Sequence, residues 1–168
     1  MSGGAIIVTA TFGDGDNGWL QELRRTYYPP ERNRVPAHLT LFRQLPPSLE
    51  GELATRLARF AASRPPFASV TGVMDLGEGT ALRVESDDLM RVREELADIF
   101  HGLLTPQDFA PWRPHVTIQN KVARKEARAL QRSLRATFQP RPLAIRAFAA
   151  WRYRDGPWEP IRTCPFRL

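Results

Sequence analysis

The stretch HLTL at residues 38–41 recurs in pattern as HVTI at residues 115–118. Successive side chains of a β-strand point to opposite faces of the sheet, so in each stretch the histidine and the threonine share one face. The two apolar residues of each stretch share the other face and can pack against a core. We therefore predict two short strands, at residues 37–42 and 115–119, that each present an imidazole and a hydroxyl together.

The elements expected around these strands come in the same order in both halves of the chain. A strand and a helix precede each motif strand, and a helix and a strand follow it. The predicted strands are residues 5–12, 37–42, 67–76, 80–85, 115–119, 142–153 and 158–163, and the predicted helices end near residues 27, 63, 100 and 138. The matching order indicates a duplicated unit, with lobes formed roughly by residues 1–79 and 80–168.

We expect residues 1–168 to form one domain of the α+β class. Each lobe is predicted to be a strand-helix-strand-helix-strand unit with an antiparallel sheet, and the two sheets flank a central cleft with the helices outside. Polar residues mark the expected helix starts. Asp16 or Asn17, then Ser48, then Asp87 or Asp88 can act as N-caps.

Facing strands of this kind supply the groups that cleavage of a phosphodiester needs. One neutral imidazole can take a proton from the attacking oxygen while the other, protonated, gives a proton to the leaving oxygen. Two threonine hydroxyls can donate hydrogen bonds to the phosphate oxygens. His38, Thr40, His115 and Thr117 are therefore the candidate catalytic residues, and the chemistry requires no metal and no cofactor.

A histidine or a threonine in a single strand is more often structural than catalytic, but two identical pairs at equivalent positions favour a shared site. The chain has three histidines, and the third, His101, lies late in a predicted helix without a following threonine. We interpret His101 as structural. Two histidines without a nearby Asp, Glu or Cys are a poor ligand set for a metal.

On these two motifs, and on the stretch of residues 113–122 around the second, the chain resembles the two-histidine (2H) phosphoesterases. Within them it is most similar to the bacterial group of 2′-5′ RNA ligases and RNA 2′,3′-cyclic phosphodiesterases. The resemblance implies a bilobal α+β fold and the opening of 2′,3′-cyclic phosphates to 2′-phosphates, or reversible 2′-5′ ligation. It also implies that His38 is the acid and His115 the base during ring opening.

Four residues near the motifs are candidates for substrate binding. Arg43 follows the first motif, Asn120 and Lys121 follow the second, and Trp112 precedes the second in a proline-rich loop. Each of the polar three can reach a phosphate or a ribose, or can be a solvated loop residue. Trp112 can stack on a base or pack. Ligase-like relatives often carry an arginine shortly after the second motif, where this chain has residues 119–121 as QNK.

Charge and composition are compatible with an anionic substrate. The formal net charge is +6, and almost all of the positive charge is arginine, which binds phosphate bidentately. No stretch approaches the ~20 apolar residues of a membrane span, so we expect no membrane partner. The single cysteine, Cys164, excludes an intrachain disulfide and agrees with a cytoplasmic protein. We expect a monomer.

Two functions of different kinds fit the sequence. The first is a metal-independent phosphodiesterase that acts on RNA 3′ ends or small cyclic nucleotides. The second is a non-catalytic module that binds the same RNA ends or nucleotides in the same cleft. The intact pair of imidazoles favours the enzyme, because a binding module does not need them.

Overall fold

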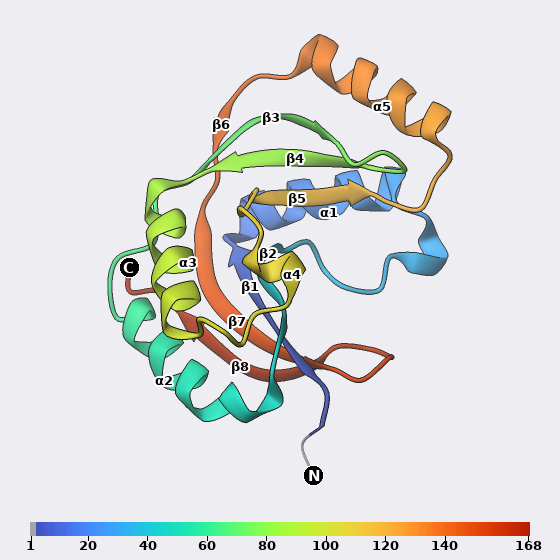
Figure 1. Ribbon diagram of the computed structural model, residues 1–168. Helices are drawn as coiled ribbons and strands as arrows, with labels where there is room; N and C mark the ends of the chain where they lie inside the picture. Colours follow the sequence, from blue (N-terminus) through green and yellow to red (C-terminus); the bar gives the residue numbers. More distant parts are fainter. Residues whose placement is uncertain (1–2) are drawn as a thin grey trace.

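The computed structural model describes residues 3–168, which form two antiparallel four-stranded sheets and five α-helices (Figure 1). The first sheet has the order β2-β1-β7-β8 and the second the order β5-β4-β3-β6. Their bounds are Leu39–Leu45, Ala5–Phe12, Ile145–Tyr153 and Glu159–Pro165 in the first sheet, then His115–Gln119, Thr80–Glu85, Ser69–Asp75 and Arg141–Pro142 in the second. The α+β class with antiparallel sheets is confirmed.

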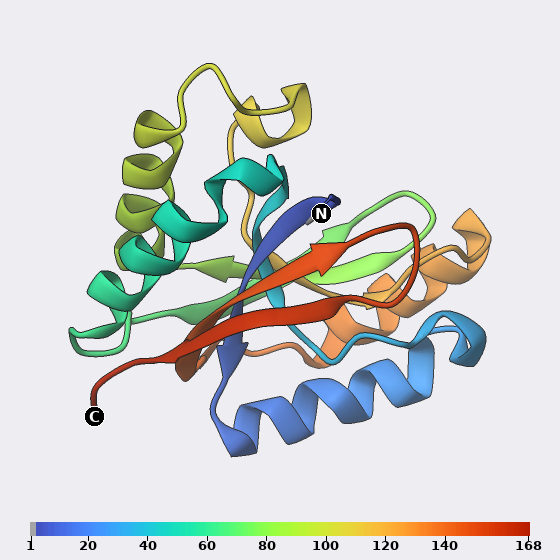
Figure 2. The same cartoon turned by 90° about the horizontal axis from the view of Figure 1, so that it is seen from below.

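The helices lie on the outer sides of the two sheets (Figures 1 and 2). Helix α5 packs on β3 and β4, α1 lies along β5, and α2 and α3 lie side by side. Their bounds are Asp14–Tyr27 (α1), Glu50–Ala61 (α2), Asp87–Ile99 (α3), Pro106–Phe109 (α4) and Arg124–Thr137 (α5), with 3-10 turns at Pro30–Arg32 and Pro47–Leu49. No helix in residues 3–168 is long and apolar enough to span a bilayer.

Each sheet takes strands from both halves of the chain. Strand β3 of the first half pairs with β4 of the second, while β7 of the second half pairs with β1 of the first. The lobes therefore do not follow residues 1–79 and 80–168. The reason is the tight turn between β3 and β4, because two strands joined by a short hairpin must pair within one sheet. The repeated units have instead exchanged their third strands.

The exchange preserves the expected symmetry of the two units. In the first sheet the order β2-β1-β7 corresponds to β5-β4-β3 in the second, so β2 and β5 are equivalent edge strands. One continuous core runs through both sheets, and its fully buried residues include Val8, Phe42 and Phe148 in the first and Val116 and Ile118 in the second. The two motif strands are thus fixed to a single core.

The predicted helix starts differ from the observed ones. Helix α1 begins after Gly13 without a side-chain cap, because the Asp16 carboxylate instead accepts hydrogen bonds from the Ala144 amide and the Arg141 guanidinium. Ser86, not the aspartates that follow it, caps α3 by accepting from the Leu89 amide. Ser48 lies inside the 3-10 turn that precedes α2 and caps nothing.

Candidate active site

The two motif strands face each other across a cleft of about 1090 Å³. Strands β2 and β5 are the edges of their respective sheets and contact each other, so the polar faces of both meet in one space. The cleft is lined by His38, Thr40, His115 and Thr117 together. The structure thus brings together all four residues that the sequence singled out.

Both imidazoles are anchored in the same way. The Nδ1 atom of His38 lies 2.7 Å from the carbonyl oxygen of Pro36, and Nδ1 of His115 lies 2.7 Å from that of Arg113. A carbonyl oxygen only accepts, so each Nδ1 carries the hydrogen. The Nε2 atom of each neutral ring is left with its lone pair available to the cleft. The carbonyl group two residues before each histidine therefore fixes the tautomer and the orientation of the ring.

Both histidines favour the neutral form, and His38 does so more strongly. Burial lowers the pKa of His38 to about 4, opposed by the Pro36 carbonyl and assisted by the positive charges of Arg24 and Arg43 and by His115. Burial also lowers the pKa of His115, opposed by the Arg113 carbonyl and assisted by Arg43 and Arg113. Arg43 therefore acts on both imidazoles, and at pH 7 both rings favour the neutral form.

The two threonines line the cleft with free hydroxyls, while side chains from other elements donate hydrogen bonds to their backbone carbonyls. The Trp112 indole donates from Nε1 to the Thr40 carbonyl at 3.0 Å, and Arg24 donates from Nη1 to the Thr117 carbonyl at 2.7 Å. Across residues 3–168, no protein group bonds to either hydroxyl. Both hydroxyls are thus available to a ligand.

Arg24 joins the two lobes at the cleft. Its second terminal nitrogen donates to the Val35 carbonyl at 2.9 Å, just before the first motif, and its guanidinium stacks on Tyr28. The side chain comes from α1, reaches β5 and is almost completely buried. Sequence reasoning missed this residue. The available signal was a charged side chain one turn after Leu20, on the apolar stripe of its helix.

Two tryptophans enclose His38 from the side of β7. The Trp158 ring meets the imidazole edge-on with ring centroids 5.0 Å apart, and Trp151 lies behind Trp158 at 6.1 Å. Trp151 in turn donates from Nε1 to the hydroxyl of Thr9, whose backbone pairs with Thr40. No sequence signal pointed to Trp158, because it lies 120 residues from His38 and only the β7–β8 hairpin brings it to the cleft.

The four predicted substrate-binding residues separate into two pairs. Arg43 and Asn120 line the cleft, each five residues after its histidine. Lys121 is exposed in a left-handed turn with φ of 61°, outside the residues that line this cleft. Trp112 lies on the outer side of β2, where its indole supports Thr40. The structure brings further side chains to the cleft, namely Arg24, Tyr28, Arg32, Gln44, Gln107, Tyr153, Arg154 and Trp158.

A close backbone contact positions Asn120 at the rim. A Cβ atom on Gly79 would lie 2.3 Å from the Gln119 carbonyl oxygen, so only glycine fits between β4 and the end of β5. Within residues 3–168, no group of three or more His, Cys, Asp or Glu side chains is arranged to hold a metal ion.

The sequence matches the family model of the 2′-5′ RNA ligase superfamily over residues 12–157. No curated protein matches the chain significantly. The fold is similar to those of E. coli LigT complexed with 3′-AMP (16% identity, TM-score 0.62, 99% of each chain) and with NADP+ (17%, 0.64, 100% of each chain). It is also similar to that of TT0787 of Thermus thermophilus (16%, 0.62, 97% of this chain and 98% of that chain).

At these identities the solved structures show a shared fold, and the family model carries the assignment. The matched residues include both motif strands. The chain therefore belongs to the 2′-5′ RNA ligase superfamily, among the two-histidine phosphoesterases.

Proposed function

We propose that this protein is a metal-independent phosphodiesterase that opens 2′,3′-cyclic phosphates of RNA ends or small nucleotides to 2′-phosphates. The observation that carries the proposal is the matched anchoring of His38 and His115, each with Nδ1 bonded to a carbonyl and Nε2 available to the same cleft. Two such nitrogens can serve one phosphoryl group as base and acid. Nucleotide complexes of the similar LigT fold, with 3′-AMP, ATP and NADP+, support a nucleotide ligand.

In the proposed reaction, water attacks the phosphorus and loses a proton to the Nε2 of one histidine. The bond between phosphorus and the ribose 3′ oxygen breaks, and that oxygen takes a proton from the Nε2 of the other histidine. The products are a 2′-phosphate and a 3′-hydroxyl. The same steps with an RNA 5′-hydroxyl in place of water form a 2′-5′ linkage, so one site serves hydrolysis and reversible ligation.

The surroundings of the two histidines favour His38 as the base and His115 as the acid. A pKa of about 4 keeps His38 neutral and ready to accept a proton across the physiological range, whereas His115 retains a proton more readily. This assignment reverses the one implied by family resemblance. A bound phosphate would raise the pKa of both rings, and the less buried ring is the one that gains a proton first.

The remaining cleft residues have complementary roles in the proposal. The free hydroxyls of Thr40 and Thr117 donate to the non-bridging phosphate oxygens as their charge builds. Arg43, which already acts electrostatically on both imidazoles, binds the same phosphate, and Asn120 lines the same cleft at the equivalent position just after β5.

The test is a product assay with 2′,3′-cyclic mononucleotides, cyclic-phosphate-ended RNA and 2′-5′ dinucleotides. His38→Ala and His115→Ala should each lower kcat at least about 100-fold, as expected for loss of a general acid or base. His101→Ala is the matched control, because this exposed residue lies away from the cleft. EDTA should leave the rate unchanged. Tight nucleotide binding without product would support the binding module, and unaltered turnover in both histidine variants would refute the mechanism.

A further inference from the structure

Helix α5 and the turn before it hold most of the excess positive charge of the molecule. Residues 121–137 contain six basic residues and one acidic residue, a net +5 against +6 for the whole chain. Five of the basic residues lie on α5 itself, and they are Arg124, Lys125, Arg128, Arg132 and Arg135. We call these five the basic face of α5.

The basic face lacks the ion pairs that other helices of this protein have. Arg25 pairs with Glu22 on α1, Arg56 with Glu52 on α2, and Arg91 with Asp88 on α3. Among the described residues, no acidic group lies within ion-pair distance of the basic face. The Asp75 carboxylate attracts Arg128 and Arg135 from a longer range, and Arg135 donates to the Val73 carbonyl at 3.2 Å. The one acid of the helix, Glu126, has only apolar residues three and four positions away.

This arrangement opposes the stability of the helix. Arg124, Arg128 and Arg132 follow each other at four-residue spacing, where like charges repel. Arg124 and Lys125 occupy the first turn, where the helix dipole disfavours positive charge. An anionic ligand along the helix would relieve both effects, so the charge pattern indicates such a ligand.

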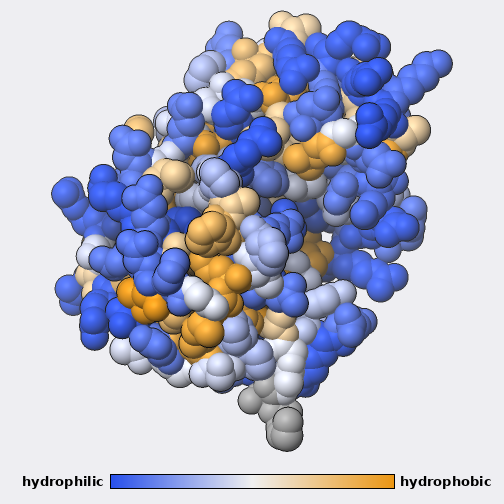
Figure 3. All heavy atoms as spheres, viewed as in Figure 1, coloured by the Kyte–Doolittle hydropathy of each residue, from blue (hydrophilic) through white to orange (hydrophobic). Residues whose placement is uncertain are grey.

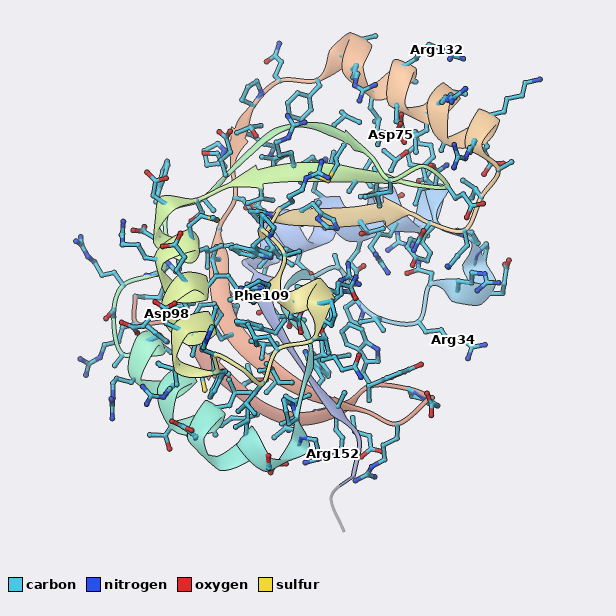
Figure 4. All side chains as sticks on the ribbon, viewed as in Figure 1. Arg34, Asp75, Asp98, Phe109, Arg132 and Arg152 are labelled. Carbon is cyan, nitrogen blue, oxygen red and sulfur yellow. The ribbon has the colours of Figure 1, made fainter. Side chains whose placement is uncertain are left out.

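The basic face is a continuous, exposed surface. At 100° per residue its five members fall within an arc of about 100°. The buried side of the helix, with Ala127, Leu130 and Gln131, lies outside that arc. Arg132 points away from the sheet (Figure 4), and hydrophilic residues cover the surface over α5 (Figure 3). Four residues of helix advance about 6 Å, so successive arginines form a linear row of cations.

The row begins at one end of the cleft. Asn120 lines the cleft and precedes α5 by four residues, and Leu76 lines it from the neighbouring strand end. Gln131 of α5 donates to the Asp75 carboxylate at 3.1 Å, so the middle of the helix is attached to the residue before Leu76. A chain that leaves the cleft past these residues meets the basic face next.

We propose that the basic face of α5 binds the phosphodiester backbone of a single-stranded RNA whose 3′ end occupies the cleft. The inference rests on the proposed function for the identity of the chain in the cleft. A row of arginines without base-reading or apolar side chains suits a polyphosphate and carries no sequence preference. An anionic membrane is disfavoured, because the apolar side of α5 is already buried against β3 and β4.

The test compares two triple variants with equal change in charge. R124Q/R128Q/R132Q removes the row, while R59Q/R146Q/R162Q removes exposed arginines on α2, β7 and β8, which line neither the cleft nor the basic face. Fluorescence anisotropy with a labelled single-stranded RNA ending in a 3′-hydroxyl measures binding without turnover. Hydrolysis of a 2′,3′-cyclic mononucleotide measures the cleft alone.

We expect the row variant to bind RNA about tenfold more weakly at low salt, with a plot of log affinity against log salt shallower by about 2. Its mononucleotide kinetics should match the unsubstituted protein, and the control variant should keep its RNA affinity. The melting temperature of the row variant should not fall, because the substitutions remove the repulsion between its like charges. RNA affinity lost equally in both variants, or in neither, would overturn the proposal.

Further arms separate the alternatives. In one arm, the unsubstituted protein is tested for binding to anionic phospholipid vesicles. If it binds them, and if the row variant loses that binding but keeps its RNA binding, the ligand is a membrane surface and the RNA proposal is overturned. A second outcome is that the row variant binds RNA more weakly but the unsubstituted protein turns over no cyclic phosphate. The role of the basic face in RNA binding would then stand, and the proposed function would be rejected.

Discussion

At the scale of single residues, the two equivalent histidines differ in how strongly their neighbours lower the imidazole pKa. His38 and His115 share the same backbone anchor, but Trp158 closes only the His38 side of the cleft. An aromatic ring displaces water without offering a charge, so it disfavours the imidazolium. The asymmetry between proposed base and acid thus comes from side chains outside the two motifs.

The dependence of kcat/KM on pH is the first prediction. Activity requires neutral His38 and protonated His115, so kcat/KM should rise as pH passes about 4 and fall as His115 loses its proton below the ordinary value of 6.5. The optimum should lie on the acidic side of neutral, with about a tenfold loss per pH unit beyond the upper limb. Initial rates on a cyclic mononucleotide from pH 3 to 9 test this, and a rate that still climbs above pH 7 would contradict it.

Substitution of Trp158 provides the second prediction. Trp158→Ala should expose His38 to water and move its pKa upward, which shifts the acidic limb of the kcat/KM profile to higher pH. Trp158→Phe keeps a ring beside the imidazole and should restore most of the original profile. Phe109→Ala is the control, because its side chain is exposed and is not among the residues that line the cleft. An acidic limb that does not move in Trp158→Ala would show that Trp158 has no influence on His38.

At the scale of elements, local pattern located the strands and the helix ends but not the helix caps. The alternation around residues 38–41 and 115–118 located both motif strands, although β2 begins at Leu39, just after His38, and ends at Leu45 instead of residue 42. Strands β1, β4 and β5 have the predicted bounds. The expected cap at Asp16 failed because its partners, Arg141 and Ala144, are more than 120 residues away. Contacts of that range are invisible to local sequence patterns. The approach of Trp158 is another such contact, and for Arg24 the helical pattern indicates burial but not the carbonyl groups that it binds.

The outer edge of β2 illustrates a second contact that sequence could not predict. The Asp108 carboxylate, in the short helix α4, accepts hydrogen bonds from the backbone amides of Arg43 and Gln44 at 2.9–3.1 Å. Arg93 donates to the Leu41 carbonyl at 2.7 Å and to the Asp108 carbonyl at 2.6 Å. Side chains of the second half thereby take the place of a neighbouring strand, and they hold Arg43 beside the cleft.

Removal of that carboxylate is the third prediction. Asp108→Ala leaves two amides of β2 without partners, and we expect the free energy of unfolding to fall by about 2–4 kcal/mol. Denaturation by urea measures the change. Asp98→Ala, at an exposed position of α3, should stay within about 0.5 kcal/mol of the unsubstituted protein (Figure 4). Equal stability of the two variants would show that β2 needs no support from α4.

At the scale of the whole molecule, exchange of the third strands ties the lobes into one folding unit. Strand β3 depends on β4 and β6, and β1 lies between β2 and β7, so neither half of the chain completes a sheet. The continuous core and Arg24 add contacts between the lobes.

Cooperative unfolding is therefore the fourth prediction. Far-UV circular dichroism and tryptophan fluorescence should report one coincident transition in urea, as expected for a two-state domain. The fragment of residues 1–79 alone should show no cooperative transition, since β1 and β3 both lose partners. Two separable transitions, or a folded fragment, would contradict the interdependence of the lobes.

The exchanged strands also bear on descent. A precursor consisting of one repeat could not have closed its own sheet, and two identical chains would have had to trade their last strands to make both. If the two units descend from one repeat, such an ancestor would have been an obligate pair with two interchangeable imidazoles. In one chain that holds both units, each histidine can change alone, and among the described residues only His38 has an aromatic ring at its side.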